Sequence, residues 1–309
     1  VCLLLVGILF YLPVYQFIVL DTDGKQLTGT AAIAMNREFV NTCAGRLTDE
    51  KICADIAAYQ ALFHDPENVS KDTTKKTLTD RAYFKYILPY SDYWKLINGN
   101  YIDPCAYDSS FSAVINMDLE NGIDFYSARD KKISTLLNQV YEDWNFSDSE
   151  KAFWLDRISS VTIPYEYGYH TGWEMLFSCL ELFAIGMIGI CICVSGTFSG
   201  EYQSGADSII LSSRYGKSKL LTAKILAAFA YSFFLFTLFL LVGCGILLAG
   251  FGMDGWELPV QVLNTISPYD LSLAGAAVTA VGTLYLILAG MVSFTLLLSA
   301  KMRSAVSVL

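Results

Sequence analysis

Four long apolar runs alternate with polar sequence along the chain, and they predict membrane-spanning helices. The runs extend over 1–19, 173–198, 220–250 and 271–300. Each is long enough to cross about 30 Å of hydrocarbon at about 1.5 Å per helical residue. The first run also suits a signal peptide, but no basic segment precedes it. We therefore predict a membrane protein with an α-helical transmembrane bundle of four visible helices, the first at 1–20.

Both ends of the sequence indicate a piece of a longer chain. It begins with Val1 rather than Met, and apolar residues resume at Ser304, just after Lys301 and Arg303. This second feature predicts the start of a fifth helix within 304–309.

Basic residues mark one side of the predicted bundle. They are Arg214, Lys217, Lys219 and Lys224 between the second and third helices, and Lys301 and Arg303 after the fourth. Because cytoplasmic connections carry an excess of Lys and Arg, both connections are expected inside the cell. The segment 21–172 and the acidic loop with Asp254, Glu257 and Asp270 are then expected outside. The sequence thus predicts a multi-pass protein of the cell membrane, with membrane helices and their connections over 173–309.

The external segment 21–172 is about 150 residues long, enough for one domain. Helical patterns cover 28–40, 50–63 and 130–143, and Ser147 with Glu150 forms a capping box that opens a further helix. The pair Asn121-Gly122 between the runs 111–119 and 123–127 predicts a β-hairpin. An α+β extracellular domain follows.

Three of the eight cysteines, Cys43, Cys53 and Cys105, lie in this external segment. A disulfide among them leaves one thiol unpaired. Cys43 and Cys53 flank a short turn, so a bond between these two is one alternative and free thiols are the other.

The polar segment between the second and third predicted helices has a helical pattern of its own. Tyr202, Ala206 and Ile209 recur at helical spacing, with polar residues on the other sides. The segment is too polar to span a bilayer. We predict an amphipathic helix at 199–217 that docks against another chain at the inner membrane face.

Sites for chemistry are hard to find in this sequence. Gly216-Lys217-Ser218 matches the end of a phosphate-binding loop, but Leu211 stands where the first glycine of that motif is needed. His64 and His170 have no acidic or cysteine cluster at ligand spacing. We expect no catalytic residue, no metal site and no cofactor, and therefore no enzyme, and no nucleic-acid partner.

Glu181 is an acidic residue inside the second apolar run. It follows Glu174 by seven residues, which places it about 10 Å deeper along a helix, where an ionised carboxylate is costly unless it faces protein or water. It belongs either to a translocation path or to an interface with a neighbouring helix.

The segment after the second apolar run resembles the corresponding part of permeases of the type-2 ATP-binding-cassette (ABC) exporter family. The matching residues are Glu201-Tyr202, Gly205, Ile209-Ile210-Leu211, Ser212-Ser213, Arg214, Lys217-Ser218-Lys219 and Leu220-Leu221-Thr222-Ala223-Lys224. Arg214 stands where family members often have proline. The large insert after the first helix, with Gly172-Trp173 before the second, is similar to a subset of these permeases from Gram-positive bacteria.

This resemblance implies a permease of the bacterial cytoplasmic membrane with six helices in the full chain. It pairs with a second permease copy or a paralogue, and with cytoplasmic ABC ATPase subunits that bind ATP and Mg²⁺. The segment 199–217 is then the coupling helix. In this family the apolar side chains that contact the ATPase would be those of Tyr202, Ile209 and Ile210. Charge pairs with the ATPase would come from Glu201 and Arg214, and Gly205 belongs to the shared motif.

The sequence is also compatible with two other functions. One is mechanotransmission, in which a permease with four helices and one large external domain moves an extracellular partner instead of a substrate. The other is an external domain that senses a peptide or cell-wall ligand. The substrate itself is not readable from the sequence.

Overall fold

The computed structural model describes residues 2–71, 77–105, 112–120, 122–140, 144–213, 215–216, 218–302, 304 and 308. The chain divides into two compact units. One, the long-helix unit, comprises Val1–Val14, Met175–Gly252 and Ala277–Leu309. The other, the inserted unit, comprises Tyr15–Glu174 and Met253–Ala276, so it takes up both segments that the sequence places outside the membrane.

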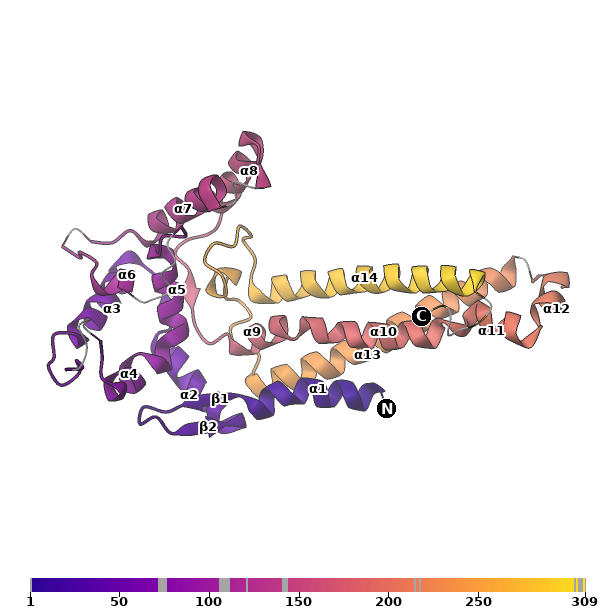
Figure 1. Cartoon of the computed structure of the whole chain (residues 1–309), viewed down its shortest axis with the longest axis horizontal. Coiled ribbons are helices and arrows are strands. Elements are labelled where there is room, and N and C mark those ends of the chain that lie inside the picture. The colour runs from indigo at the N-terminus through magenta and orange to yellow at the C-terminus, as the bar shows by residue number, and fades with distance from the viewer. Residues whose placement is uncertain are drawn as a thin grey trace. The chain divides into compact units, whose positions relative to one another are not determined.

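The long-helix unit contains all or part of each apolar helix (Figure 1). They are α1 (Cys2–Gln16), α9 (Thr171–Ser178), α10 (Phe183–Val194), α11 (Gly196–Ser204), α12 (Asp207–Ser212), α13 (Lys219–Phe251) and α14 (Leu273–Lys301). A 3₁₀ turn, Leu180–Leu182, joins α9 to α10.

Within the described parts of the chain, three helical segments are apolar and long enough to cross a membrane: Thr171–Ser204, Lys219–Phe251 and Leu273–Lys301. The helix predicted at 1–20 is shorter, because α1 has 15 residues and ends at Gln16. Ile18–Leu20 instead forms strand β1, which pairs with β2 (Gln26–Thr28) across a turn in which the Asp21 carboxylate accepts the Asp23 and Lys25 N–H groups. The predicted start of a fifth helix at 304–309 lies mostly outside the described residues.

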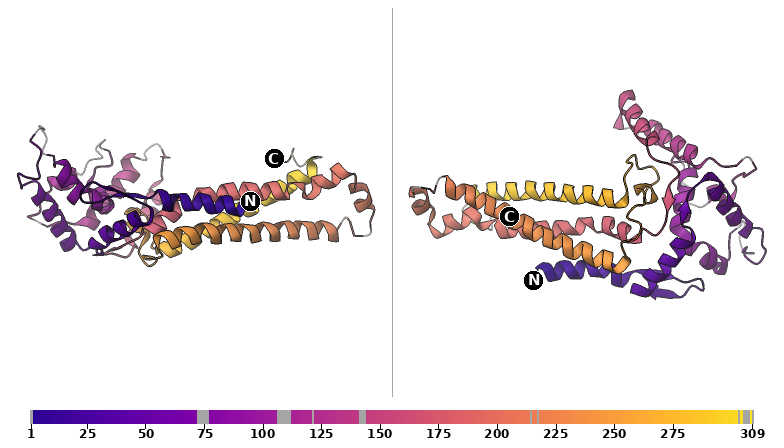
Figure 2. Two further views of the ribbon diagram at one scale, coloured as in Figure 1. Left: turned by 90° about the horizontal axis from the view of Figure 1, so that it is seen from below. Right: turned by 180° about the vertical axis from the view of Figure 1, so that it is seen from behind.

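Glycines let the helices of this unit approach closely. A Cβ atom on Gly243 of α13 would lie 3.0 Å from the rings of Phe10 and Phe183, and one on Gly186 of α10 would lie 2.7 Å from the ring of Phe239. These phenylalanines are fully or almost fully buried. The contacts place α1 and α10 against the same stretch of α13, which Figure 2 shows from two further directions. Small residues at helix crossings permit such close packing.

The inserted unit consists of shorter elements. They are β1, β2, α2 (Gly29–Thr42), β3 (Gly45–Arg46), α3 (Asp49–Leu62), α4 (Asp80–Tyr86), α5 (Ser91–Tyr101), α6 (Ser112–Ile115), α7 (Phe125–Thr135), α8 (Asp148–Ser159) and β4 (Glu166–Tyr167), with 3₁₀ turns at Leu88–Tyr90 and Val260–Val262 and a π-helical turn at Leu136–Val140. Helices dominate, and the sheets are two antiparallel pairs, β1–β2 and β3–β4.

Several local predictions for this unit agree with the structure. Helices α2 and α3 cover the ranges predicted at 28–40 and 50–63. The capping box forms as expected, with the Ser147 hydroxyl accepting the Glu150 N–H and the Glu150 carboxylate accepting the Ser147 N–H. The helix predicted at 130–143 begins earlier, at Phe125, and residues 141–143 lie outside the described ranges.

The predicted β-hairpin around Asn121-Gly122 is wrong. Within 112–120 and 122–127 the chain forms α6 and the first turn of α7, joined by irregular backbone, and residues 111 and 121 are not described. Contacts with α3 explain the difference. The Gln60 amide donates to the carbonyl oxygens of Val114 and Met117 at 2.8 and 2.9 Å, and the Asp49 carboxylate accepts the Phe125 N–H at 2.9 Å.

A tyrosine-centred network joins distant parts of the inserted unit. The Tyr126 hydroxyl donates to the Leu47 carbonyl oxygen and accepts the Tyr165 N–H, each at 2.8 Å. The Leu47 N–H donates to the Tyr165 carbonyl oxygen at 2.8 Å, next to the β3–β4 pair. The Arg129 guanidinium, 3% exposed, donates to the Tyr165 hydroxyl and pairs with Asp130. This network ties β3, α7 and β4 together.

The disulfide alternative for the inserted unit is not realised. Cys43, Cys53 and Cys105 all carry free thiols. Burial raises the pKa of the Cys43 thiol to about 11.

Candidate functional site

The segment predicted as one coupling helix consists of two short helices. Helix α11 ends at Ser204, and α12 begins at Asp207. Gly205 between them has a φ of +68°, a left-handed conformation that favours glycine. The Ala206 N–H bonds to the Glu201 carbonyl oxygen, and the Gly205 N–H bonds to that of Tyr202. This is a Schellman motif, which ends α11 and turns the chain.

Ser299 of α14 fixes the beginning of α11. Its hydroxyl accepts the N–H groups of Phe198 and Ser199 at 3.0 and 3.1 Å, and it donates to the Ser195 carbonyl oxygen at 2.6 Å. Ser299 and Ser199 are fully buried. A side chain inserted into the backbone hydrogen bonds of a helix is a known cause of kinks, and here it separates α10 from α11. The joint is thus built from α14.

Lys224 of α13 and Ala300 of α14 also hold α11. The Lys224 ammonium of α13 pairs with the Glu201 carboxylate, lies 5.6 Å from the centroid of the Phe198 ring and donates to the Thr197 carbonyl oxygen. The Tyr202 hydroxyl donates to the Ala300 carbonyl oxygen of α14 at 3.3 Å. Helix α11 is therefore bonded to both α13 and α14.

The predicted coupling residues have different environments in this arrangement. Glu201 is engaged by Lys224 inside the chain. Tyr202 is 40% exposed, and Ile209 is 73% exposed on α12. Ile210 is half-buried and lines a small cavity of about 130 Å³ together with Phe198 and Leu221. Arg214 lies outside the described residues.

Glu181 lies in the 3₁₀ turn between α9 and α10 and is exposed. The turn interrupts the helix that the sequence predicts as continuous from 173 to 198. The two alternatives for Glu181 both stay open.

Sequence reasoning missed two residues that build this site. Ser299 and Lys224 come from other helices, 104 residues after Ser195 and 23 residues after Glu201. The sequence did indicate Lys224, because this lysine is the last residue of the motif that follows the segment. Nothing in the sequence around Ser299 indicates its role, because it is a single serine in an apolar run.

The segment is joined to its neighbouring helices by hydrogen bonds and one ion pair. Among the described residues, no group of three or more His, Cys, Asp and Glu side chains could hold a metal ion. What the segment offers is an exposed apolar side chain on a short helix that is bonded, through α11, to the ends of two long helices.

Comparison of the chain with protein-family models, with curated proteins and with solved structures gave no match.

Proposed function

We propose that this chain is the membrane-spanning permease subunit of an ATP-driven ABC transporter, which couples ATP hydrolysis by a separate cytoplasmic ATPase to export of a substrate. The observation that carries the proposal is the position of Ile209. It is 73% exposed on α12, and α12 follows a helix bonded to both α13 and α14. An apolar side chain presented in this way suits a groove on a partner.

The charge distribution supports a cytoplasmic position for this segment. Lys219 and Lys224 lie in the first turns of α13, and Lys301 ends α14. The contacts of Ser299 with Ser195 and of Lys224 with Glu201 bring these ends together. Basic residues at the ends of membrane helices favour the cytoplasmic side.

The hydrogen bonds and the ion pair of α11 also suggest how a displacement of α12 would reach α13 and α14. An ATPase that moves α12 would move α11, and the Glu201–Lys224 and Tyr202–Ala300 contacts would carry the displacement into α13 and α14. Packed elements with two discrete arrangements convert such displacements into a change of state. Partner ATPase subunits, ATP with Mg²⁺ and a second permease chain belong to this proposal.

The test is copurification of the ATPase with the tagged chain, purified in mild detergent from cells that express it naturally. The ATPase is identified by photolabelling with 8-azido-ATP and by vanadate-sensitive ATP hydrolysis in the eluate. Ile209→Asp should reduce both signals at least about tenfold, because burying an isoleucine contributes about 1.5–3 kcal/mol and a carboxylate in its place adds a desolvation cost.

Ser208→Asp is the matched control, since it adds the same charge at the neighbouring exposed position of α12. Ile210 is left unchanged because it is half-buried and supports the joint. Equal ATPase recovery with Ile209→Asp and Ser208→Asp, or no azido-ATP labelling with the unmodified chain, would overturn the proposal.

A further inference from the structure

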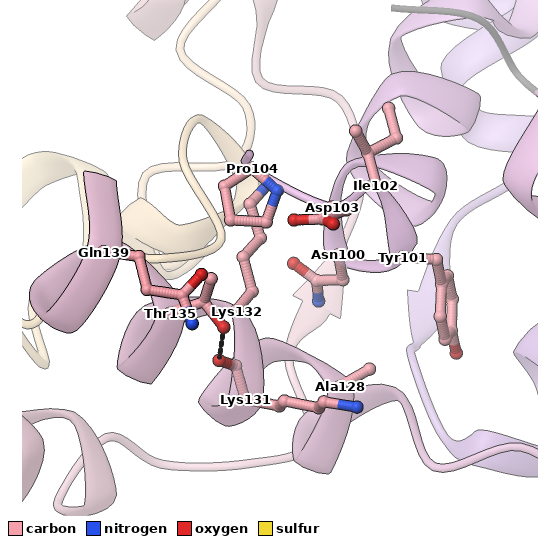
Figure 3. A pocket seen from close by; sticks show the side chains of 10 residues that line it. All are labelled: Asn100, Tyr101, Ile102, Asp103, Pro104, Ala128, Lys131, Lys132, Thr135 and Gln139. Carbon is pink, nitrogen blue, oxygen red and sulfur yellow. Dashed lines mark hydrogen bonds between the residues drawn. The ribbon is translucent and has the colours of Figure 1, made fainter. Parts of the chain in front are cut away.

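A polar cavity of about 430 Å³ lies in the inserted unit, between the end of α5 and α7 (Figure 3). Its walls are the last turn of α5 with residues 102–104 after it, one side of α7, and Gln139 from the π-helical turn. Small-molecule sites fall in the range of about 300–1,000 Å³, so this cavity has room for a small ligand.

Asn100, the penultimate residue of α5, places an unpartnered donor in this cavity. The side chain is 3% exposed, and its Oδ1 accepts the Thr265 hydroxyl at 2.8 Å. Its Nδ2 has no hydrogen-bond partner among the described residues. Figure 3 shows the Asn100 amide projecting from α5 into the space that the other lining residues surround. Since a buried donor left unpaired costs about 1–3 kcal/mol, the amide favours a ligand with an acceptor.

Two lysines of α7 add positive charge beside this donor. Lys131 is exposed and Lys132 is half-buried, and neither forms a salt bridge with a described carboxylate. The Lys132 ammonium donates to the Gly99 carbonyl oxygen, a neutral partner. Burial lowers the pKa of Lys132 because the charged form loses hydration. A water molecule can satisfy Asn100, but the two lysines still exceed the single carboxylate among the lining residues by one positive charge.

Asp103 supplies the one carboxylate of the lining. One of its oxygens accepts the Cys105 N–H at 2.9 Å. Figure 3 shows the Asp103 carboxylate beside the Asn100 amide, so the lining offers an acceptor as well as donors, which suits a ligand that carries both an anionic group and a donor group.

We propose that this cavity binds a small ligand with a carboxylate, whose oxygens accept hydrogen bonds from the Asn100 amide and the Lys132 ammonium. The Asp103 carboxylate receives the donor end of the ligand. A dipeptide has both groups at a suitable size. The proposal is independent of any ATPase partner, because all its residues belong to the inserted unit.

Calorimetric titration of the full chain in detergent tests this site with three probes: glycylglycine, glycylglycine amide and inorganic phosphate. Glycylglycine should bind saturably at one site per chain, and the amide, which lacks the carboxylate, should bind at least about tenfold more weakly. Phosphate that binds in place of the dipeptide would assign the site to a free oxyanion. No saturable binding of glycylglycine or phosphate up to about 10 mM would overturn the proposal.

Asn100→Asp is the decisive variant, because it keeps the acceptor for Thr265 and replaces the unpartnered donor by an oxygen. It should weaken glycylglycine binding at least about tenfold. Asn98→Asp is the matched control, since Asn98 lies on the same helix at 2% exposure and outside the cavity lining.

Lys132→Gln, with Lys25→Gln at an exposed position as its control, gives a second measurement that spares the α5 core. Unchanged binding in both Asn100→Asp and Lys132→Gln would overturn the assignment.

Discussion

The hydroxyl of Ser299 donates to the carbonyl oxygen of Ser195 across 2.6 Å and joins the end of α14 to the joint between α10 and α11. The Ser299 hydroxyl oxygen also accepts the backbone N–H groups of Phe198 and Ser199, so this one side chain forms three hydrogen bonds. The Ser195 carbonyl oxygen also accepts the Ser199 hydroxyl at 2.9 Å, so it is the Phe198 and Ser199 N–H groups that depend on Ser299.

We expect Ser299→Ala to destabilise the long-helix unit by about 1–3 kcal/mol, because the replaced hydroxyl leaves buried backbone groups unpaired. The measurement is the thermal unfolding midpoint of the detergent-solubilised chain. Ser293→Ala on the same helix is the control, since the exposed Ser293 hydroxyl bonds only to Ala289 one turn earlier. Equal midpoints for the two variants would contradict the role of Ser299.

Gly186 and Gly189 of α10 should respond oppositely to alanine. A Cβ at Gly186 would lie 2.7 Å from the Phe239 ring, which is 2% exposed and cannot move aside, so Gly186→Ala should cost about 1–3 kcal/mol by overpacking. A Cβ at Gly189 meets open space, and Gly189→Ala should be neutral or stabilising by up to about 1 kcal/mol. The thermal unfolding midpoints of both variants test this prediction. An unchanged midpoint for Gly186→Ala would contradict the close contact between Gly186 and the Phe239 ring.

Tyr126→Phe should destabilise the inserted unit by about 1–3 kcal/mol. The change removes the hydroxyl that links the Leu47 carbonyl to the Tyr165 N–H and leaves both groups buried without it. Tyr83→Phe serves as the control because Tyr83 is 39% exposed. Chemical denaturation, monitored by tryptophan fluorescence, gives the difference in the free energy of unfolding. Equal values for Tyr126→Phe and Tyr83→Phe would contradict a stabilising role of the Tyr126 hydroxyl.

The cysteines of the inserted unit should differ strongly in reactivity. Burial raises the pKa of Cys43 to about 11, so only about one thiol in a thousand is ionised at pH 8, and the thiolate is the reactive form. Cys105 is exposed. Iodoacetamide at pH 8 should therefore modify Cys105 well before Cys43, as measured by peptide mass spectrometry over time. Raising the pH toward 11 should speed the reaction of Cys43, and a Cys43–Cys53 disulfide mass would contradict the structure.

Features with a local physical cause were predictable from the sequence. Apolar runs with few breaks predict α13 and α14, because a helix satisfies its own backbone groups wherever water is excluded. The capping box at Ser147 and Glu150 forms within four residues and needs no distant partner. Helices α2 and α3 follow from their own patterns in the same way.

Features that depend on distant partners were decided only by the tertiary structure. Asn121-Gly122 favours a hairpin locally, but Gln60 and Asp49 of α3 bond to backbone groups on either side and hold helical segments there. The segment 199–217 has a continuous helical pattern in its sequence, but the Schellman turn at Gly205 and the Ser299 hydroxyl divide the helices there.

Hydropathy along the chain was enough to locate the segments that are apolar enough to enter a membrane and the amphipathic stretch between the long helices. Only the folded arrangement brings Glu201 to Lys224, turns Ile209 outward and Ile210 inward, and leaves the Asn100 Nδ2 without a hydrogen-bond partner among the described residues. The physical reason is that hydropathy and capping act over a few residues, whereas a buried polar group takes its partner from whichever segment folding brings within about 3 Å.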